Sequence, residues 1–229
     1  MHLTYFGHSC FLVEVPGARL VLDPWLAGNP HGSVDPATVP CDFVLCTHAH
    51  EDHIADALTL AKLHGATIVA PFELANHFAE LGATTLDPMP GGGIDFPWGR
   101  IQMTPAIHSS ALELPKGENR AMGVASGYLI RAGGRVLYHS GDTALFGDMA
   151  LIGRHGIDVA LIPIGDFYTM GPADAVEALH LLRPKLAVPM HYNTFPGIRQ
   201  DPQAFATKAA AAGHTVRVMK AGEAIEWFA

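Results

Sequence analysis

The chain has 229 residues, of which 49% are hydrophobic and 16% are charged, and its formal net charge at pH 7 is −8. This composition supplies enough apolar material for a large core, and the acidic balance argues against a non-specific binder of nucleic acid or acidic membranes. No linker-like or low-complexity segment divides the chain, so we expect one domain over residues 1–229.

The N-terminus and the cysteines predict a cytoplasmic protein. The opening MHLTYFGHSC has no basic stretch followed by an uninterrupted apolar run, as a signal peptide would, and no window approaches the roughly 20 apolar residues of a membrane span. Cys10, Cys41 and Cys46 have no paired spacing and lie in apolar surroundings. This pattern is typical of buried thiols in a reducing compartment and does not favour a cysteine metal site.

In the first half of the chain, short strands are expected to alternate with helices. LTYF, FLVEV and RLVLD are strand-like runs separated by turn residues, and the continuously apolar DFVLC (42–46) is typical of a buried strand. Helical spacing of apolar residues and Pro/Gly boundaries then predict the remaining elements: a helix over 53–65, a strand over 67–70 and a helix over 71–82.

The second half follows a loop predicted over 87–99. Its expected elements are a strand over 100–108, a hairpin over 122–142 turned at Gly133-Gly134, a helix over 145–155, a strand over 158–166, a helix over 172–183, a strand over 186–191, a helix over 201–213 and two short terminal strands.

The two halves echo each other. RLVLD and DFVLC precede a helix in the first half, and RVLYHSGD and DVALIPIGD precede a helix in the second. This echo predicts two βα halves packed sheet to sheet, with helices covering the sheets. Ligands in such layered folds bind outside the carboxyl ends of strands.

Metal-capable side chains stand where apolar strands end. A single aspartate at such a place is usually a turn former, and a single histidine is usually exposed or hydrogen-bonded. Their repetition at five strand ends points instead to a shared metal site. The residues are Asp23, His48 with His50, His108, Asp142 and His191.

The segment THAHEDH (47–53) gathers three imidazoles and two carboxylates. His48 and His50 are two residues apart, so in an extended segment they point to the same side. With His108 as a third ligand they form a three-nitrogen site that suits zinc and leaves a fourth position open. Asp52 and His53 lie at the turn into the following helix, where they can face a second metal.

A second ion needs further ligands, and Asp142 and His191 are available for it. Asp142 suits a position between the two ions, because each of its carboxylate oxygens can bind one metal.

The order of these residues resembles the metallo-β-lactamase superfamily. H-x-H-x-D-H after a buried strand is followed by a His, an Asp and a His, and the likeness extends from GHSCFLVE (7–14) to PMHYNTFPG (189–197). The resemblance implies an α/β fold, the four-layer αβ/βα sandwich of two mixed sheets flanked by helices.

The resemblance also implies a ligand set. One ion is expected on three histidines and a second on an aspartate and two histidines, with an aspartate bridging and another supporting the histidine loop from behind. In this order the residues are His48, His50 and His108; Asp52, His53 and His191; Asp142; and Asp23.

Longer stretches narrow the resemblance. The segments 138–153, 157–175 and 188–202 resemble a widespread family of bacterial and archaeal metal-dependent hydrolases. That family is similar to ascorbate-6-phosphate lactonase and, more distantly, to N-acylphosphatidylethanolamine phospholipase D. The resemblance therefore implies hydrolysis of an ester, a lactone or a phosphodiester.

The implied mechanism uses a hydroxide that bridges two divalent ions and attacks a carbonyl carbon or a phosphorus. Asp52 or Asp142 is expected to orient it. Zinc suits the mixed imidazole and carboxylate ligands best, and Mn, Fe or Ni are also compatible. Simple counting gives the site a charge of about +1, so an anionic small-molecule substrate is expected to be tolerated. The sequence leaves self-association into a homo-oligomer open.

Several side chains outside the ligand set are candidates for supporting roles. His8 fits either a place near the site or a structural hydrogen bond. His139 is a candidate for the surroundings of the ligands, although a packed core histidine is the favoured interpretation. The candidates for contact with substrate follow buried strands or lie in loops: Asp166, Tyr168, Thr169, His31 and Asn193.

Four alternatives remain beside this hypothesis. An RNA-processing nuclease shares the ligand set, but the chain has no obvious basic arm. A thioesterase or glyoxalase-type hydrolase performs the same chemistry at a carbonyl carbon. A flavodiiron-type redox protein would need Glu in place of His50. A metal-dependent binding or sensing protein would keep the ligands without turning over a substrate.

Overall fold

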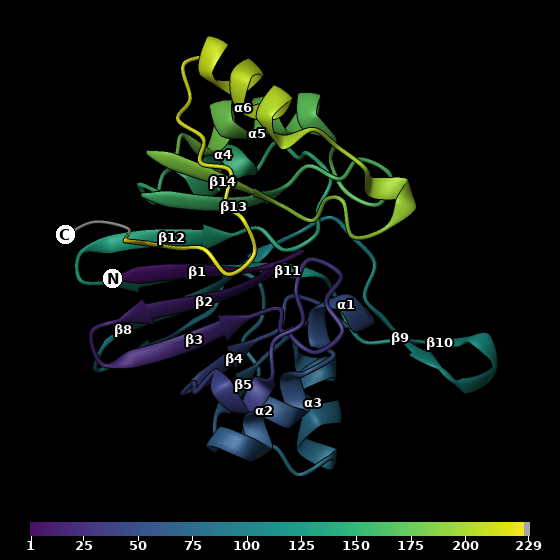
Figure 1. The fold of residues 1–229 in the computed structure, drawn as a ribbon. Coiled ribbons are helices and arrows are strands. Elements are labelled where there is room, and N and C mark those ends of the chain that lie inside the picture. Colours follow the sequence, from purple (N-terminus) through teal and green to yellow (C-terminus); the bar gives the residue numbers. More distant parts are fainter. Residues whose placement is uncertain (227–229) are drawn as a thin grey trace.

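The computed structural model describes residues 1–226 and has four layers (Figure 1). Two mixed sheets face each other, and helices cover the outer side of each sheet. The predicted α/β sandwich is thereby confirmed. The N-terminus lies at one side of the sandwich, and a two-stranded hairpin projects from the opposite side.

The first sheet is built from the N-terminal part of the chain and one C-terminal strand. Its order is β15-β1-β2-β3-β4-β5-β6, with antiparallel pairing up to β3 and parallel pairing from β3 to β6. The strands are β1 (His2–Gly7), β2 (Cys10–Val15), β3 (Ala18–Leu22), β4 (Phe43–Leu45), β5 (Thr67–Val69), β6 (Thr85–Leu86) and β15 (Ala224–Glu226), and the covering helices are α1 (Glu51–Ile54), α2 (Ala57–His64) and α3 (Phe72–Glu80).

The second sheet repeats this plan with the order β14-β13-β12-β11-β8-β7. Its strands β7, β8, β11 and β12 pair antiparallel, and β12, β13 and β14 pair parallel. The strands are β7 (Gly93–Phe96), β8 (Gly99–Pro105), β11 (Ser126–Ala132), β12 (Arg135–His139), β13 (Val159–Pro163) and β14 (Leu186–Met190), and the helices are α4 (Met149–Gly153), α5 (Pro172–Leu182) and α6 (Pro202–Ala211).

Alternation along the strands builds three apolar layers. On β3, Leu20 and Leu22 point into the core between the two sheets, and Val21 points into the core beneath α2 and α3. On β13, Val159 faces the central core, and Ala160 packs with the helices of the second half. Because side chains alternate with a period of two, a strand buried on both faces needs a continuous apolar run, as the sequence has here.

The parallel strands of both halves direct their carboxyl ends toward the same region. Asp23 follows β3, and Thr47 follows β4 after one residue. In the other sheet, Asp142 follows β12 and His191 follows β14 directly. The echo between the halves therefore corresponds to two similar sheet edges that meet at one place.

Several predicted elements differ in detail. The helix expected over 53–65 is divided into α1 and α2, because the carboxylate of Asp56 accepts the backbone N–H groups of Leu26 (2.6 Å) and Ala27 (2.9 Å) instead of capping the second helix. The loop predicted over 87–99 contains β7, whose partly buried residues give only a weak strand signal.

The remaining differences concern short elements. The segment after His108 forms a hairpin of β9 (Ala111–Leu114) and β10 (Glu118–Ala121), which sequence patterning does not predict. Of the two terminal strands expected, one is β15, and the other is a single bridge between Val216 and Ala187. Short 3₁₀ helices cover Pro36–Thr38, Pro115–Gly117 and Pro196–Ile198.

The three cysteines are free and buried, as the sequence predicts. No helix within residues 1–226 is long and apolar enough to span a membrane.

The hydroxyl of Tyr128 links the two sheets and generates a stability prediction. It lies on β11, fully buried, within hydrogen-bond distance of the carbonyl oxygens of Cys46 (2.9 Å) and Val69 (3.0 Å) in the facing half. Tyr128→Phe should lower the free energy of unfolding by about 1–2 kcal/mol, because the buried hydrogen bond from the hydroxyl to these carbonyls is lost. Urea denaturation followed by circular dichroism measures this change. Tyr168→Phe, at an exposed tyrosine, is the matched control and should change stability little.

Candidate metal centre

A buried carboxylate, Asp23, organises the segment that carries the candidate ligands. Its Oδ1 accepts the backbone N–H of Thr47 at 2.8 Å, and its Oδ2 accepts the Thr47 hydroxyl at 2.8 Å. The same Oδ2 lies 2.7 Å from Nδ1 of His53. Because a carboxylate only accepts, Nδ1 of His53 carries the hydrogen, and Nε2 is the atom that faces the site.

His48, His50 and His108 form one group whose nitrogens lie within 4.8 Å of one another. Nε2 of His48 and Nδ1 of His50 are 2.9 Å apart, and the ring of His108 stands 5.1 Å from each of the other two rings. The Thr47 hydroxyl lies 3.0 Å from Nδ1 of His48 and donates to Asp23, so its oxygen accepts from Nδ1 and leaves Nε2 for the centre.

Loop contacts bring these histidines together from distant parts of the chain. The Ser110 hydroxyl accepts the backbone N–H of Ala49 at 3.2 Å, which joins the segment after His108 to the histidine loop. The Thr143 hydroxyl accepts the backbone N–H of Ile107 at 3.0 Å, which joins the same segment to the loop that carries Asp142.

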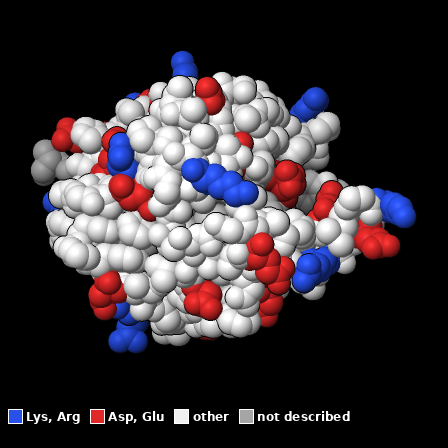
Figure 2. All heavy atoms as spheres, turned by 90° about the horizontal axis from the view of Figure 1, so that it is seen from below, with Lys and Arg blue, Asp and Glu red and all other residues white. Residues whose placement is uncertain are grey.

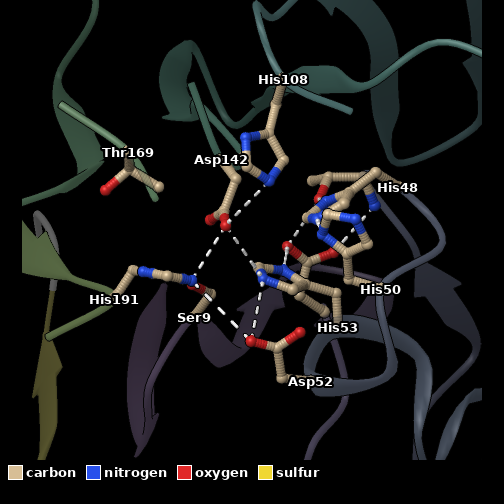
Figure 3. A network of polar contacts seen from close by, with 12 residues as sticks. Ser9, His48, His50, Asp52, His53, His108, Asp142, Thr169 and His191 are labelled. Carbon is tan, nitrogen blue, oxygen red and sulfur yellow. Dashed lines mark hydrogen bonds and ion pairs between the residues drawn. The ribbon is translucent and has the colours of Figure 1, made fainter. Parts of the chain in front are cut away.

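Asp142 lies at the middle of the cluster (Figure 3). Its Oδ2 is 2.9 Å from Nε2 of His191, 3.4 Å from Nε2 of His53 and 3.7 Å from Nε2 of His108. A second group of possible ligand atoms within 4.8 Å of one another consists of His48, His53 and Asp142, and a third consists of His8, Asp52, His53 and His191. Asp142 therefore connects the histidines of both halves.

Asp52 stands on the side of the cluster that opens to solvent. Its side chain is 20% exposed, compared with 2% for Asp142. Its Oδ2 accepts from Nε2 of His8 at 2.9 Å and lies 3.9 Å from Nε2 of both His53 and His191. Nδ1 of His8 is 2.6 Å from the Thr194 hydroxyl, so His8 ties the carboxylate to the loop after β14.

Burial and neighbouring charges give the imidazoles of the cluster different protonation states. Burial lowers the pKa values of His48, His50 and His108, so these rings are neutral at pH 7. Burial also opposes a charge on His53, but Asp142, Asp23 and Asp52 outweigh it and raise its pKa well above the ordinary value. Metal binding at Nε2 of His53 therefore has to displace a proton.

The carboxylates are ionised in the same environment. Burial alone would raise the pKa of Asp142, but His191 and His53 outweigh burial and hold it well below its usual range. The pKa of Asp52 is lowered in the same way, with burial opposed by His53 and His8. His48, His50 and His108 are thus neutral and Asp52 and Asp142 are ionised, and these are the protonation states that a divalent cation requires of its ligands.

Unpaired buried atoms test whether these residues fit a metal. Seven buried side-chain atoms of the described residues have no hydrogen-bond partner, and among them are Nε2 of His53 and Oδ1 of Asp142 in the cluster. Each such atom costs about 1–3 kcal/mol of stability when it is left unsatisfied. Since both belong to a cluster of nitrogen and carboxylate donors, a bound cation accounts for them, and the residues present fit a metal site.

The predicted supporting residues fall into two groups. Asp23 and His8 contact the candidate ligands His53 and Asp52, as described above. His139 is instead a packed core residue, because its Nε2 lies 3.0 Å from the carbonyl oxygen of Ser9 and its Nδ1 accepts the backbone N–H of Gly141.

Four other predicted residues, Asp166, Thr169, Asn193 and His31, lie outside the lining of the cleft above the cluster. Asp166 and Asn193 adopt left-handed backbone conformations in exposed turns, with φ angles of +73° and +62°. The Asn193 side chain accepts the backbone N–H of Gln200, and the Thr169 hydroxyl donates to the carbonyl of Met170. These contacts give the Asn193 and Thr169 side chains local roles in shaping loops.

A cleft of about 1,020 Å³ opens above the cluster. Tyr168, a predicted contact residue, is part of its wall. Sequence reasoning missed most of the other residues that line it, because single aromatic and acidic residues in loops have no periodic signal. They include Trp25, Glu51, Ser109, Glu113, Phe167 and Phe195.

Comparison with known proteins identifies the relatives of the chain. Residues 2–191 match a family model described as a β-lactamase superfamily domain. A UPF0173 metal-dependent hydrolase of Opitutus terrae is 69% identical over 226 residues, covering 99% of this chain and all of the relative. A UPF0173 metal-dependent hydrolase of Thermus thermophilus is 45% identical, covering 98% of both chains.

A solved structure supports the same relationship. Igni18, described as a metallo hydrolase from the archaeon Ignicoccus hospitalis, is 41% identical and superimposes with a TM-score of 0.89, covering 98% of this chain and 97% of its own. The fold, the cluster of metal-capable side chains and the full-length similarity lead to one conclusion. The chain belongs to the UPF0173 metal-dependent hydrolases of the β-lactamase superfamily.

Proposed function

We propose that residues 1–229 form a single hydrolase domain that uses two divalent ions to cleave a small ester, lactone or phosphodiester. The position of Asp142 carries this proposal. Its carboxylate lies within 3.7 Å of Nε2 atoms from His53, His108 and His191. His108 belongs to the first group of possible ligands described above, and His53 and His191 belong to the third. A bridging carboxylate in a dinuclear site needs such a place.

In the proposed arrangement, three neutral imidazoles hold the first ion and a mixed set holds the second. Zinc is the best match to these nitrogen and oxygen donors, since a three-histidine site with an open position is a common catalytic zinc arrangement. The first set is His48, His50 and His108, the second set is Asp52, His53 and His191, and Asp142 belongs to both.

When bound, two divalent ions lower the pKa of a water and polarise the oxygen of the substrate that it attacks. The protein residues orient these participants. Asp23 fixes the ring of His53, and His8 fixes the carboxylate of Asp52. Asp52 is the more exposed of the two carboxylates and lines the cleft, so we assign it the role of orienting the attacking water.

Nucleic acid is a poorer match than a small molecule. Binding a nucleic acid strand depends on lysine and arginine contacts to phosphates. The net charge of the chain is −8, and none of the described residues that line the cleft is a lysine or an arginine. A protein that binds metal without hydrolysis remains the outcome if metal-loaded protein turns over no ester, lactone or phosphodiester.

Removal of single ligands should test the ligand assignment. Asp142→Ala should lose both ions and His108→Ala about one of the two, because Asp142 serves both positions. Elemental analysis gives the metal content, and hydrolysis of bis(p-nitrophenyl) phosphate and a simple lactone gives the activity. His48→Ala should lose metal and activity while the fold is retained. His2→Ala, at an exposed histidine, should retain both. Full metal content in Asp142→Ala would contradict the bridging role.

Asp23→Asn tests whether the hydrogen bond between Asp23 and His53 supports metal binding. The amide is nearly isosteric, but it presents N–H groups where Nδ1–H of His53 needs an acceptor. Loss of such a supporting carboxylate typically reduces metal affinity or activity about 10–100-fold. Competition with a chromogenic chelator measures the affinity, and circular dichroism confirms that the fold is retained. Unchanged metal affinity in this variant would show that Asp23 has a purely structural role.

The pH dependence of the metal-free protein follows from the histidines. The pKa of His8 is lowered to about 4 by burial, and the pKa of His48 is also lowered. In the unfolded chain these rings take up protons below about pH 6.5, while the folded protein resists protonation until its lower pKa values are reached. Stability is therefore fully present above pH 6.5 and lost as the pH falls toward 4. Thermal melts of chelator-treated protein from pH 7.5 to 4.5 should show a falling midpoint.

Metal-loaded protein should resist this loss down to a lower pH, since bound metal stabilises the folded state. A melting midpoint of the metal-free protein that rises toward pH 4.5 would contradict the lowered histidine pKa values.

A further inference from the structure

We infer that the cleft selects substrates whose group beyond the reacting bond is apolar and uncharged or cationic, and that it disfavours an anionic group there. This inference rests on the proposed hydrolase function. It concerns the walls and the mouth of the cleft and leaves the candidate metal ligands aside. Four aromatic side chains and two acidic side chains of the cleft carry it.

One wall is an aromatic pair built from both halves of the chain. Trp25 follows β3, and Phe195 follows β14, yet their rings are stacked with centroids 5.7 Å apart and planes 16° apart. The ring of His8 meets both edge-on, at 5.2 Å from Trp25 and 5.7 Å from Phe195. Since His8 also binds Asp52, this apolar wall stands directly beside the candidate metal centre.

The other two aromatic residues of the cleft are exposed on a well-defined turn. Phe167 and Tyr168 are 73% and 54% exposed, and their rings meet edge-to-face at 4.8 Å. The backbone N–H of Thr169 donates to the carbonyl of Asp166 at 2.8 Å, and that of Asp166 donates to the carbonyl of Met170. Large apolar side chains held exposed beside a cleft are typical of a binding surface.

The two aromatic walls approach each other at Gly197. A Cβ atom at this glycine would lie 3.6 Å from the Phe167 ring, so the loop after β14 passes close to Phe167. The aromatic residues thus belong to the lining of one cleft, together with Asp52 and Asp142. An alkyl or aryl group of a substrate can replace water on this surface and gain the hydrophobic free energy of burial.

The charges at the cleft have one sign. Glu51, at the start of α1, and Glu113, on β9, are exposed and line the cleft. Asp52 and Asp142 are engaged by histidines. Within the part of the chain that the structure describes, the cleft lining contains neither lysine nor arginine. On the surface around the base of the projecting hairpin, outside the cleft lining, Figure 2 shows acidic side chains with basic ones among them.

This distribution sharpens the expectation about substrate charge. The sequence suggests tolerance of an anion because the loaded metal site carries positive charge. That argument applies to the reacting group, which contacts the ions. A carboxylate or phosphate further along the substrate would meet Glu51 and Glu113 without a compensating cation, and like charges at short range repel.

Three 4-nitrophenyl esters with the same leaving group and nearly equal chain length test the inference. They are the hexanoate (neutral), the monoester of adipic acid (anionic) and the 6-aminohexanoate (cationic). In each, the oxygen of water bonds to the acyl carbon, the bond to the nitrophenolate oxygen breaks, and both protons of water pass to the buffer, which leaves a carboxylate and 4-nitrophenolate. We expect kcat/KM of metal-loaded protein for the anionic ester to be about tenfold below that for the neutral ester.

Variants assign this selectivity to the cleft. Glu51→Gln with Glu113→Gln should bring the anionic and neutral esters closer together. Glu118→Gln is the matched control, because this exposed residue lies on the same hairpin outside the cleft lining. Phe167→Ala should lower kcat/KM for the hexanoate about tenfold and affect the acetate ester less, since lost apolar contact scales with area. Phe72→Ala, an exposed phenylalanine on α3, is its control.

The outcomes separate this inference from the proposed function. If the adipate ester is cleaved as fast as the hexanoate, or the glutamate variants leave their ratio unchanged, the inference is wrong while the hydrolase function stands. If no ester is cleaved faster than by His48→Ala, the proposed ester hydrolysis fails. Binding of the corresponding 4-nitrophenyl amides then tests the inference without turnover. Quenching of tryptophan fluorescence measures this binding, and the Trp25→Phe variant shows how much of the signal comes from Trp25. Tighter binding of the neutral amide supports it, and equal or tighter binding of the anionic amide overturns it.

Discussion

The buried carboxylate of Asp23 is the constraint on which the rest of the site depends. It fixes Thr47 through a backbone and a side-chain hydrogen bond and holds the ring of His53. A buried charge without partners is very costly, so this segment cannot move away from the end of β3 without losing several contacts at once. The positions of His48 and His50 follow from this anchoring. Hydrogen bonds within the protein therefore hold the side chains of the cluster in position.

The backbone at the site is held in uncommon conformations. His8, Asp23 and His191 have φ angles of +56°, +44° and +54°, in the left-handed region that residues other than glycine rarely adopt. Each such residue typically costs about 1–3 kcal/mol and persists because surrounding contacts fix it. The backbone N–H of His191 donates to the carbonyl of His8 at 2.9 Å, so two of the three support each other across the halves.

The sequence predicted the sandwich and the residues that gather in the cluster, because apolar strands that end in His or Asp combine a local signal with a topological rule. It did not predict the break between α1 and α2, which depends on the hydrogen bond that the backbone N–H of Leu26, far away in the sequence, donates to the carboxylate of Asp56. Nor did it predict the β9–β10 hairpin or the stack of Trp25 on Phe195, since these arise from tertiary contacts between segments without periodicity. Which candidate ligands bind metal remains a prediction.

Residues of the candidate metal centre and some residues of the cleft lining are carried by different kinds of structure. Asp23, Asp142 and His191 stand close to the ends of buried strands, where a shift of backbone would disturb both sheets. Phe167 and Glu113 stand on surface connections whose replacement leaves the sheets intact. The residues that select the substrate can therefore change during evolution while the metal centre stays the same. Members of one lineage can share an unchanged reaction centre and act on unlike molecules, so kinship by itself is a poor guide to the compound that each of them consumes.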